Sequence, residues 1–212
     1  KSNGDYTYFA KDIAYHFDKF KRGFTSMINV WGADHGGYIK RLTSAVKAIT
    51  KNKTDLVIKI CQLIKIIDNK KTLKMSKREG NFISLNNVIN NVGKDVTRFI
   101  MLVRKNNEDI DFDLEKVKEE SKDNPVFYVQ YAYARISSIF RILQLDIKTK
   151  IKSDKNSSLN NHELQILKKL SQWPQCIEIS LNKFEPHTIT YYLYDLVTLF
   201  HSYWNMGKDN EE

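Results

Sequence analysis

The first 70 residues alternate between helical and strand-like hydrophobic patterns. Apolar residues at spacings of three and four predict one helix over residues 9–20 and another over residues 38–49. Between them, residues 27–31 form a short apolar run that predicts a buried strand. Two β-branched runs, residues 56–60 and 63–67, predict two more strands, followed by a turn, a short strand and a loop. This alternation indicates half of a parallel α/β sheet with helices on its faces.

The rest of the chain has helical spacing, and the pattern predicts no strand beyond residue 85. Short helices are expected over residues 85–120, one of them with Asp95 as its N-cap. A long helix is predicted over residues 126–145 because a broad apolar face runs along it. Helical spacing returns at residues 164–170, and a last helix is predicted over residues 186–206.

Composition narrows the class of protein. The chain has 212 residues, 42% of them hydrophobic, which is enough for one substantial core or two small ones. The formal net charge of +9 favours a polyanionic partner. Cys61 and Cys176 lie far apart beside apolar neighbours, so we expect no metal site and no disulfide framework, and a reducing cytoplasm fits. No stretch approaches the roughly 18 apolar residues of a membrane span, so no membrane partner is expected.

Residues 74–81, Lys-Met-Ser-Lys-Arg-Glu-Gly-Asn, form a dense cationic loop between a turn and a helical region. Lys74 and Lys77 place two positive groups on one short loop, and such groups can stabilise negative charge that develops in a transition state. The alternative is a solvated basic hairpin tip, because other lysines precede the loop.

Tyr8 and Asp12 are four positions apart and therefore share one face of the first predicted helix. A carboxylate accepts a forked pair of guanidinium hydrogens, and a phenol beside it can add an acceptor. The pair is a candidate site for arginine, because lysine offers only one compact ammonium. Alternatively, Tyr8 is a half-buried aromatic residue and Asp12 an ordinary acid on the helix surface.

Gly32, Asp34 and His35 follow the predicted strand 27–31 and open the next helix. Ligands bind at such positions in open α/β sheets, and a glycine there lets a nucleotide approach the backbone. The alternative roles are structural: Asp34 could be a plain N-cap, and His35 a histidine with satisfied partners at a helix start.

These segments resemble one protein family. The loop at residues 74–78 resembles the Lys-Met-Ser-Lys-Ser signature of class I aminoacyl-tRNA synthetases, with Arg78 in the last place. Asp-Ile-Ala-Tyr at residues 12–15, preceded by Tyr8, and Trp-Gly-Ala-Asp-His at residues 31–35 are similar to the bacterial arginyl-tRNA synthetases.

The resemblance implies a role for each candidate residue. Tyr8 and Asp12 would bind the side chain of arginine. Lys77 would stabilise the β- and γ-phosphates of ATP in the transition state, and Lys74 would assist. The remaining contacts to ATP would come from Met75, Ser76, Arg78, Gly32, Asp34 and His35. The implied partners are arginine, ATP with Mg²⁺ and tRNA(Arg), with no permanently bound cofactor.

The resemblance continues through the helical part of the chain. It implies an α/β plus all-α fold class, with the C-terminal half of a Rossmann-like catalytic domain followed by a helical anticodon-binding bundle. The implied domains are residues 1–121, which include the cationic loop and connecting helices, and residues 122–212. Three aromatic residues of the bundle, Tyr131, Tyr203 and Trp204, could stack on unpaired anticodon bases or could be core residues. Two arginines, Arg135 and Arg141, could contact tRNA or only water.

The sequence contains no string like His-Ile-Gly-His, the other class I signature. We therefore expect a C-terminal portion of an arginine–tRNA ligase, monomeric and cytoplasmic, which is inactive alone because half of the ATP cradle is missing. Two alternatives stay open at this point. One is another class Ia synthetase such as the cysteinyl type, and the other is a non-catalytic module that binds RNA through its phosphates.

Overall fold

The computed structural model describes residues 3–73, 83–146, 148 and 158–209. The chain forms two compact units: residues 1–64 with 106–110, and residues 65–105 with 111–212. The predicted catalytic loop at residues 74–78 lies outside the described residues. None of the described helices combines the length and the apolar character that crossing a membrane would require.

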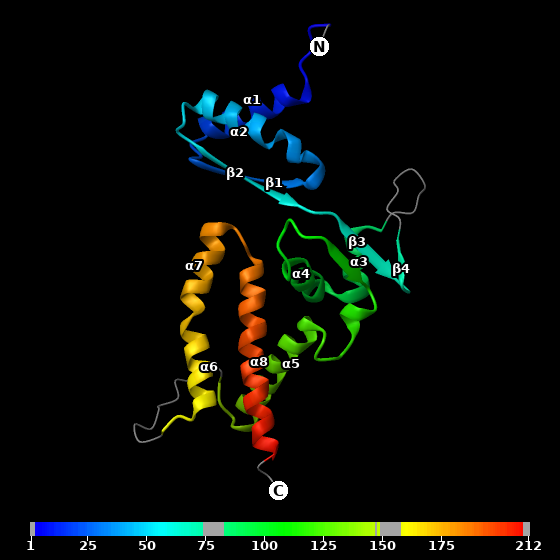
Figure 1. Cartoon of the computed structure of the whole chain (residues 1–212), viewed down its shortest axis with the longest axis vertical. Coiled ribbons are helices and arrows are strands. Elements are labelled where there is room, and N and C mark those ends of the chain that lie inside the picture. Colours follow the sequence, from blue (N-terminus) through cyan, green and yellow to red (C-terminus); the bar gives the residue numbers. More distant parts are fainter. Residues whose placement is uncertain (1–2, 74–82, 147, 149–157, 210–212) are drawn as a thin grey trace. The chain divides into compact units, whose positions relative to one another are not determined.

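The first unit is a two-stranded parallel sheet with two helices on one side of it (Figure 1). Its elements are α1 (Tyr8–Lys21), β1 (Ser26–Gly32), the 3₁₀ helix η1 (Ala33–Tyr38), α2 (Ile39–Thr50) and β2 (Asp55–Cys61). The strands pair with Ser26 opposite Asp55 and Gly32 opposite Cys61. The helix, strand, helix, strand order predicted from hydrophobic spacing is confirmed.

The core of the first unit lies between the helices and one face of the sheet. On α2, Leu42, Val46 and Thr50 follow one another at a spacing of four, and each is only 1% exposed. From β1, Met27 joins this core at 4% exposure. The spacing of the apolar residues thus places one stripe of α2 against the sheet.

Residues 27–31 form the predicted strand, but the prediction that this strand is buried is wrong for one of its two faces. Residues alternate along β1: Met27 and Asn29 are buried, whereas Ile28 and Val30 are 47% and 67% exposed. The physical reason is that successive side chains of a strand point to opposite faces, and the described helices cover only one face.

The second unit is mainly helical and carries a small sheet with strand order β4–β3–β5. The first residue of β3 and the first residue of β5 belong to the first unit, and the rest of both strands belongs to this one. Its elements are β3 (Ile64–Asp68), β4 (Lys71–Thr72), α3 (Leu85–Val92), α4 (Lys94–Leu102), β5 (Ile110–Asp113), η2 (Lys116–Lys118), α5 (Pro125–Ile142), α6 (Asn161–Ser171), α7 (Trp173–Lys183) and α8 (His187–Asp209). α8 packs against α5, α6 and α7, so it is the central helix of the bundle (Figure 1).

Two expectations for residues 85–120 are wrong. A strand, β5, is present where only helices were expected, and it adds Phe112, at 0% exposure, to the core. The acids at 109, 111 and 113 hide its period-2 pattern, because acidic residues are depleted in strands. The N-cap of α4 is Gly93 rather than Asp95, which lies in the first turn. Gly93 has a φ of 90°, a conformation that favours glycine.

Specific side chains begin the bundle helices. Asn124 caps α5: its side chain accepts from the backbone N–H of Val126 at 3.1 Å and donates to the carbonyls of Val117 and Glu119. Asn160 and Glu163 form a capping box at the start of α6. The predicted division at residues 121 and 122 falls just before the α5 cap and stays a prediction.

Candidate substrate-binding site

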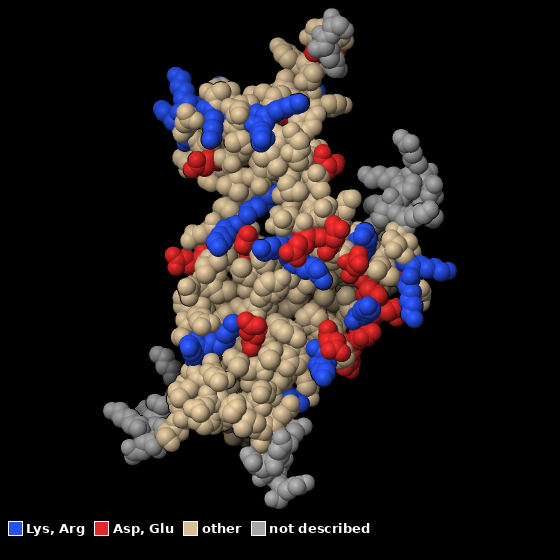
Figure 2. All heavy atoms as spheres, in the orientation of Figure 1, with Lys and Arg blue, Asp and Glu red and all other residues tan. Residues whose placement is uncertain are grey.

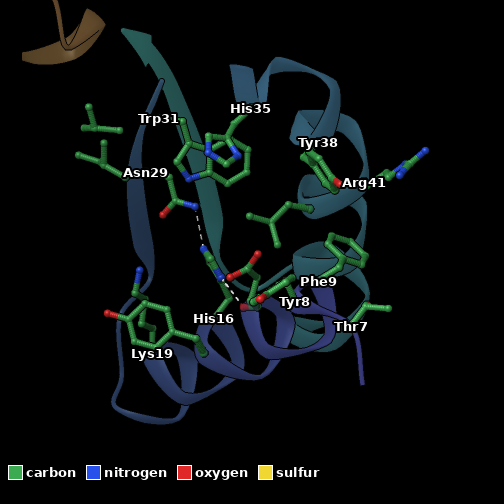
Figure 3. Close-up of a pocket in the computed structure, with 15 residues that line it drawn as sticks. Thr7, Tyr8, Phe9, His16, Lys19, Asn29, Trp31, His35, Tyr38 and Arg41 are labelled. Atoms are coloured by element: carbon green, nitrogen blue, oxygen red, sulfur yellow. Dashed lines mark hydrogen bonds between the residues drawn. The ribbon is translucent and has the colours of Figure 1, made fainter. Parts of the chain in front are cut away.

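A hollow of about 850 Å³ lies in the first unit and is lined by residues of α1, β1, η1 and α2 (Figure 3). Three predicted site residues, Tyr8, Asp12 and His35, line it. Gly32 and Asp34 belong to the neighbouring strand end and η1 and are not among its lining residues. The structure therefore brings the two predicted arginine-binding residues and one predicted ATP-binding residue to the same hollow.

Tyr8 and Asp12 come from the first two turns of α1. The side chain of Tyr8 is 87% exposed, which leaves its hydroxyl free to meet a ligand. Among the described residues that line the hollow, Asp12 carries the one carboxylate. A carboxylate beside a phenol can accept several N–H groups, which suits a guanidinium more than an ammonium.

His16, one turn beyond Asp12, is a site residue that the sequence interpretation missed. It is 4% exposed, and its ring bridges α1 and β1: Nδ1 lies 2.7 Å from the carbonyl oxygen of Asp12, and Nε2 lies 2.9 Å from Nδ2 of Asn29. Figure 3 draws both hydrogen bonds. The spacing of four that links Tyr8 to Asp12 also links Asp12 to His16, and this signal could have identified the histidine.

Two cations line the hollow on opposite sides in Figure 3. Nζ of Lys19 lies 4.4 Å from the ring centroid of Tyr15, and the guanidinium of Arg41 lies 5.7 Å from that of Tyr38. Both contacts are cation–π pairs that orient the side chains. These cations are suited to anionic groups of a ligand, such as a carboxylate or a phosphate.

An aromatic pair lines another part of the hollow, away from Tyr8 and His16 (Figure 3). The ring centroids of Trp31 and His35 are 6.0 Å apart, and Nε2 of His35 lies 3.7 Å from Oδ2 of Asp34. A Cβ added at Gly36 or Gly37 would meet no other described atom within 4 Å, so space beside this backbone is open. A ligand could therefore approach the backbone at these two glycines.

The backbone conformation at position 32 does not require a glycine, because its φ is −67°. A Cβ at this position would lie 2.7 Å from Oδ1 of Asp34, but that carboxylate is at the end of an exposed side chain that can rotate. Asp34 lies in the first turn of η1, and the N-cap position is Gly32, without a side-chain hydrogen bond. The alternative role of Asp34 as an N-cap is therefore wrong.

A second cluster of interest lies in the other unit, where Arg135 of α5 meets aromatic residues. Nη2 of Arg135 donates to the hydroxyl of Tyr131 at 2.7 Å, and Nη1 lies 3.3 Å from Nδ1 of His201. Its guanidinium lies 4.2 Å from the ring centroid of Tyr131 and 5.3 Å from that of Trp204. We call these four residues the Arg135 cluster. Within the described part of the chain, no carboxylate forms an ion pair with Arg135.

The other two candidates of the bundle have local partners. The hydroxyl of Tyr203 donates to Glu163 at 2.8 Å, which ties α8 to the start of α6. Arg141 donates to the Ser138 hydroxyl at 2.8 Å on the exposed side of α5. Tyr203 is therefore a structural link, whereas Tyr131 is 41% exposed within the Arg135 cluster.

Charge is distributed unevenly along the sequence and over the surface. Lys and Arg outnumber Asp and Glu in residues 1–64, and Figure 2 shows basic side chains over the helices of the first unit. Acidic side chains gather in and after β5, beside a few lysines (Figure 2). They are Asp111, Asp113, Glu115, Glu119, Glu120 and Asp123. Such a segment repels phosphates, so the net charge of +9 does not mark every face as an RNA surface.

The described residues contain no group of three or more His, Cys, Asp or Glu side chains that could hold a metal ion. Of the donor groups in the hollow, one carboxylate and two separated histidines do not form a ligand set for a structural metal. A metal that accompanies a nucleotide substrate is a separate matter, because such ions are held largely by phosphates and water.

Two family models match the chain. Residues 13–113 match one described as "tRNA synthetases class I (I, L, M and V)", and residues 129–211 match one described as "DALR anticodon binding domain". The parallel sheet with its hollow and the helical bundle thus define the class: the chain is part of a class I aminoacyl-tRNA synthetase. The predicted fold class, half of a Rossmann-like domain followed by an anticodon-binding bundle, is confirmed.

Curated relatives identify the group within this class. The chain is 51% identical to an arginine–tRNA ligase of Pelagibacter ubique over 212 residues, and 50% identical to one of Ruegeria pomeroyi over 217 residues. Each comparison covers 100% of this chain and 37% of the relative. The chain therefore belongs to the arginyl-tRNA synthetase family and spans about 37% of the length of these relatives.

Solved structures agree with this family. A crystal structure from Campylobacter jejuni described as an arginyl-tRNA synthetase matches with a TM-score of 0.85 at 32% identity, over 97% of this chain and 45% of that one. The Thermus thermophilus arginyl-tRNA synthetase matches with a TM-score of 0.75 at 20% identity over 97% of this chain and 42% of that one, which shows the shared fold. Neither the cysteinyl type nor a non-catalytic RNA-binding module is favoured by these comparisons.

Proposed function

We propose that this chain supplies part of the active site and the anticodon-binding part of an arginine–tRNA ligase. In the first step, the carboxylate of arginine attacks the α-phosphorus of ATP and expels pyrophosphate, which gives arginyl-adenylate. In the second step, a terminal ribose hydroxyl of tRNA(Arg) attacks the carbonyl carbon and releases AMP. The observation that supports this most is the hollow with Tyr8 and Asp12 in a chain of this family.

Asp12 and Tyr8 are proposed to bind the guanidinium of arginine. The carboxylate accepts two parallel N–H groups, and the phenol hydroxyl accepts a third. A lysine ammonium would leave acceptors unpaired, and unpaired polar groups in a site are what reject a wrong substrate most strongly. The pair therefore explains selection for arginine by chemistry rather than by size.

The part of the hollow beside Trp31 and His35 is proposed to bind ATP together with Mg²⁺. His35, Asp34 and Gly32 would contact the nucleotide, and the open backbone at Gly36 and Gly37 supports such an approach. Three further residues indicated by the sequence are also proposed to bind ATP: Met75, Ser76 and Arg78. Lys74 and Lys77 would stabilise the negative charge that builds on pyrophosphate as it leaves.

The Arg135 cluster is proposed to contact the anticodon loop of tRNA. Its guanidinium lies against aromatic rings without a carboxylate partner among the described residues, so it is free to bind a phosphate or a base edge. Tyr131 offers an exposed ring on which a base could stack. Cytoplasmic location, a monomeric state and inactivity of the 212-residue chain by itself stay predictions.

The proposal is tested by arginine-dependent exchange of pyrophosphate into ATP, measured with and without tRNA. The assay uses a full-length synthetase that contains this chain, for example a chimaera in which it replaces the matching part of the Pelagibacter ubique relative. Asp12→Asn keeps the shape of the side chain but removes the charge. We expect kcat/KM for arginine to fall at least about 100-fold, since removing one partner of a charged pair costs about 3 kcal/mol.

The matched control is Asp18→Asn on the same helix. Asp18 pairs with Arg22 at 3.0 Å on the surface and does not line the hollow. Its exchange activity should stay within about twofold of wild type, because exposed ion pairs contribute little. Equal activities of the Asp12 and Asp18 variants would contradict the proposed role of Asp12.

A further inference from the structure

The ring of His16 lies between two groups of fixed hydrogen-bonding character. On one side is the main-chain carbonyl of Asp12, 2.7 Å from Nδ1, and on the other is the side-chain amide nitrogen of Asn29, 2.9 Å from Nε2. His16 and Asn29 are 4% and 8% exposed, so water does not easily replace either bond. Both residues line the hollow in the first unit.

The partner of each ring nitrogen fixes the direction of its hydrogen bond. A carbonyl oxygen only accepts, so Nδ1 of His16 must carry the hydrogen and donate it to Asp12. The amide nitrogen of Asn29 only donates, so Nε2 of His16 must accept from it with its lone pair. The carboxamide of Asn29 therefore turns its nitrogen to His16 and its oxygen Oδ1 away from it, as Figure 3 shows.

We propose that His16 is a positioning residue that sets the specificity of the arginine pocket by fixing the orientation of Asn29. This inference rests on the proposed function of the hollow. With its nitrogen held by His16, Asn29 has only its acceptor Oδ1 left for a ligand, and this oxygen would add to the acceptors of Asp12 and Tyr8. Three kinds of acceptor around one hollow complement a guanidinium, which has five N–H donors and no acceptor.

The opposite orientation of Asn29 would present two N–H donors to the ligand. That arrangement suits a ureido group, in which a carbonyl oxygen takes the place of one guanidinium nitrogen. Citrulline, the ureido analogue of arginine, is therefore the probe that reports on the orientation of Asn29. Discrimination between arginine and citrulline should depend on His16 even though His16 is not proposed to touch either ligand.

The first variant is His16→Phe in the full-length synthetase described above, assayed by pyrophosphate exchange with saturating tRNA. Phenylalanine keeps an aromatic ring but neither donates to Asp12 nor accepts from Asn29. We expect the KM for arginine to rise about 10-fold, because one oriented hydrogen bond in the pocket is lost. The kcat should change less than about threefold, and the preference for arginine over citrulline should fall by about the factor seen in KM.

The conservative variant is His16→Gln, whose Oε1 can still accept from the amide of Asn29. We expect it to restore the KM for arginine to within about threefold of wild type. The control is His187→Phe, because His187 is also 4% exposed but lies at the start of α8 in the other unit. That variant should leave the KM for arginine and the preference over citrulline unchanged.

Asn29→Leu tests the acceptor directly and also decides the question if His16→Phe does not fold. It should raise the KM for arginine about as much as His16→Phe, and the double variant should be no worse than either single one. An unchanged arginine KM in Asn29→Leu, or equal losses in His16→Phe and His16→Gln, would overturn the inference. If Asp12→Asn abolishes exchange while these variants do nothing, only the role of His16 fails. If Asp12→Asn is fully active, the proposed function fails instead.

Discussion

Arg135 and Tyr131 are joined twice: Nη2 of the guanidinium donates to the phenol hydroxyl at 2.7 Å, and the guanidinium carbon lies 4.2 Å from the ring centroid. His201 supports the same arginine. Its Nε2 donates to the carbonyl of Tyr128 at 3.1 Å, so its Nδ1 is left to accept from Nη1. The guanidinium is thus held in one orientation on the surface of the helical bundle.

Replacing Arg135 should weaken tRNA binding without affecting arginine binding. Arg135→Lys keeps the charge but loses the planar fork and the stacking on Tyr131, so we expect the KM for tRNA to rise about 5–30-fold, which corresponds to about 1–2 kcal/mol. Aminoacylation kinetics with varied tRNA measure this change. Arg141→Lys is the comparison on the same helix, and its effect should stay below about threefold. Equal effects of the two variants would contradict a specific role for the Arg135 cluster.

The link between α6 and α8 should make stability depend on pH at both extremes. The backbone N–H of Asn160, and then the hydroxyl of Tyr203, lower the pKa of Glu163. A lowered pKa stabilises the fold above the unfolded value of about 4.3, and this contribution is lost as the pH falls through the folded value. Glu163→Gln should therefore flatten the acid side of a plot of Tm against pH, whereas an unchanged acid side would contradict this link.

Tyr203 should make the stability of the fold depend on pH on the alkaline side. The hydrogen bond to Glu163, followed by burial, raises its pKa. The stabilisation is therefore complete below the unfolded value of about 10, and it is lost as the pH rises through the folded value. Tyr203→Phe should remove this alkaline dependence of Tm, and persistence of the full dependence in the variant would show that another group causes it.

Phe112 should be among the most important core residues of the second unit, because it is 0% exposed in β5. Phe112→Ala should lower the free energy of unfolding by about 3–5 kcal/mol through lost burial and a cavity. Urea unfolding followed by circular dichroism measures this loss. Phe24→Ala is the control, since Phe24 is 51% exposed and should cost less than about 1 kcal/mol. A small loss in Phe112→Ala would mean that β5 is not part of the core.

The turn after α2 contains residues in a conformation that favours glycine. Lys51 has a φ of 52° and Asn52 a φ of 58°, both in the left-handed region. Lys51→Gly should raise the free energy of unfolding by about 0.5–1 kcal/mol, because it relieves the clash of a Cβ with the backbone. Asn52→Gly should gain less, since asparagine tolerates this region better. Chemical unfolding of both variants compares the two gains, and no gain for Lys51→Gly would contradict the strain.

The elements of the first unit follow from local patterns in the sequence. A spacing of four predicted that Tyr8 and Asp12 share a helix face, and the short run 27–31 predicted β1, because both depend only on neighbouring residues. The partnership of His16 with Asn29 could not be predicted in this way. The two residues are 13 positions apart in the sequence, and their contact depends on how α1 packs on β1.

The second unit shows the same limit. The helices α5 and α8 carry long apolar faces and were predicted, but β5 was not, because its acids obscure the alternation of Ile110 and Phe112. The Arg135 cluster joins α5 to α8 across 66 residues, so no local pattern indicates it. Tertiary packing decides which polar residues of a predicted helix become a site.

The most direct test is charging of tRNA(Arg) by a full-length synthetase that contains this chain, offered each of the 20 amino acids separately with ATP and Mg²⁺. We expect that arginine is attached and lysine is not, and that Asp12→Asn, but not Asp18→Asn, lowers the rate of charging at least about 100-fold. Attachment of a different amino acid, or of arginine with equal efficiency in both variants, would contradict the proposed function.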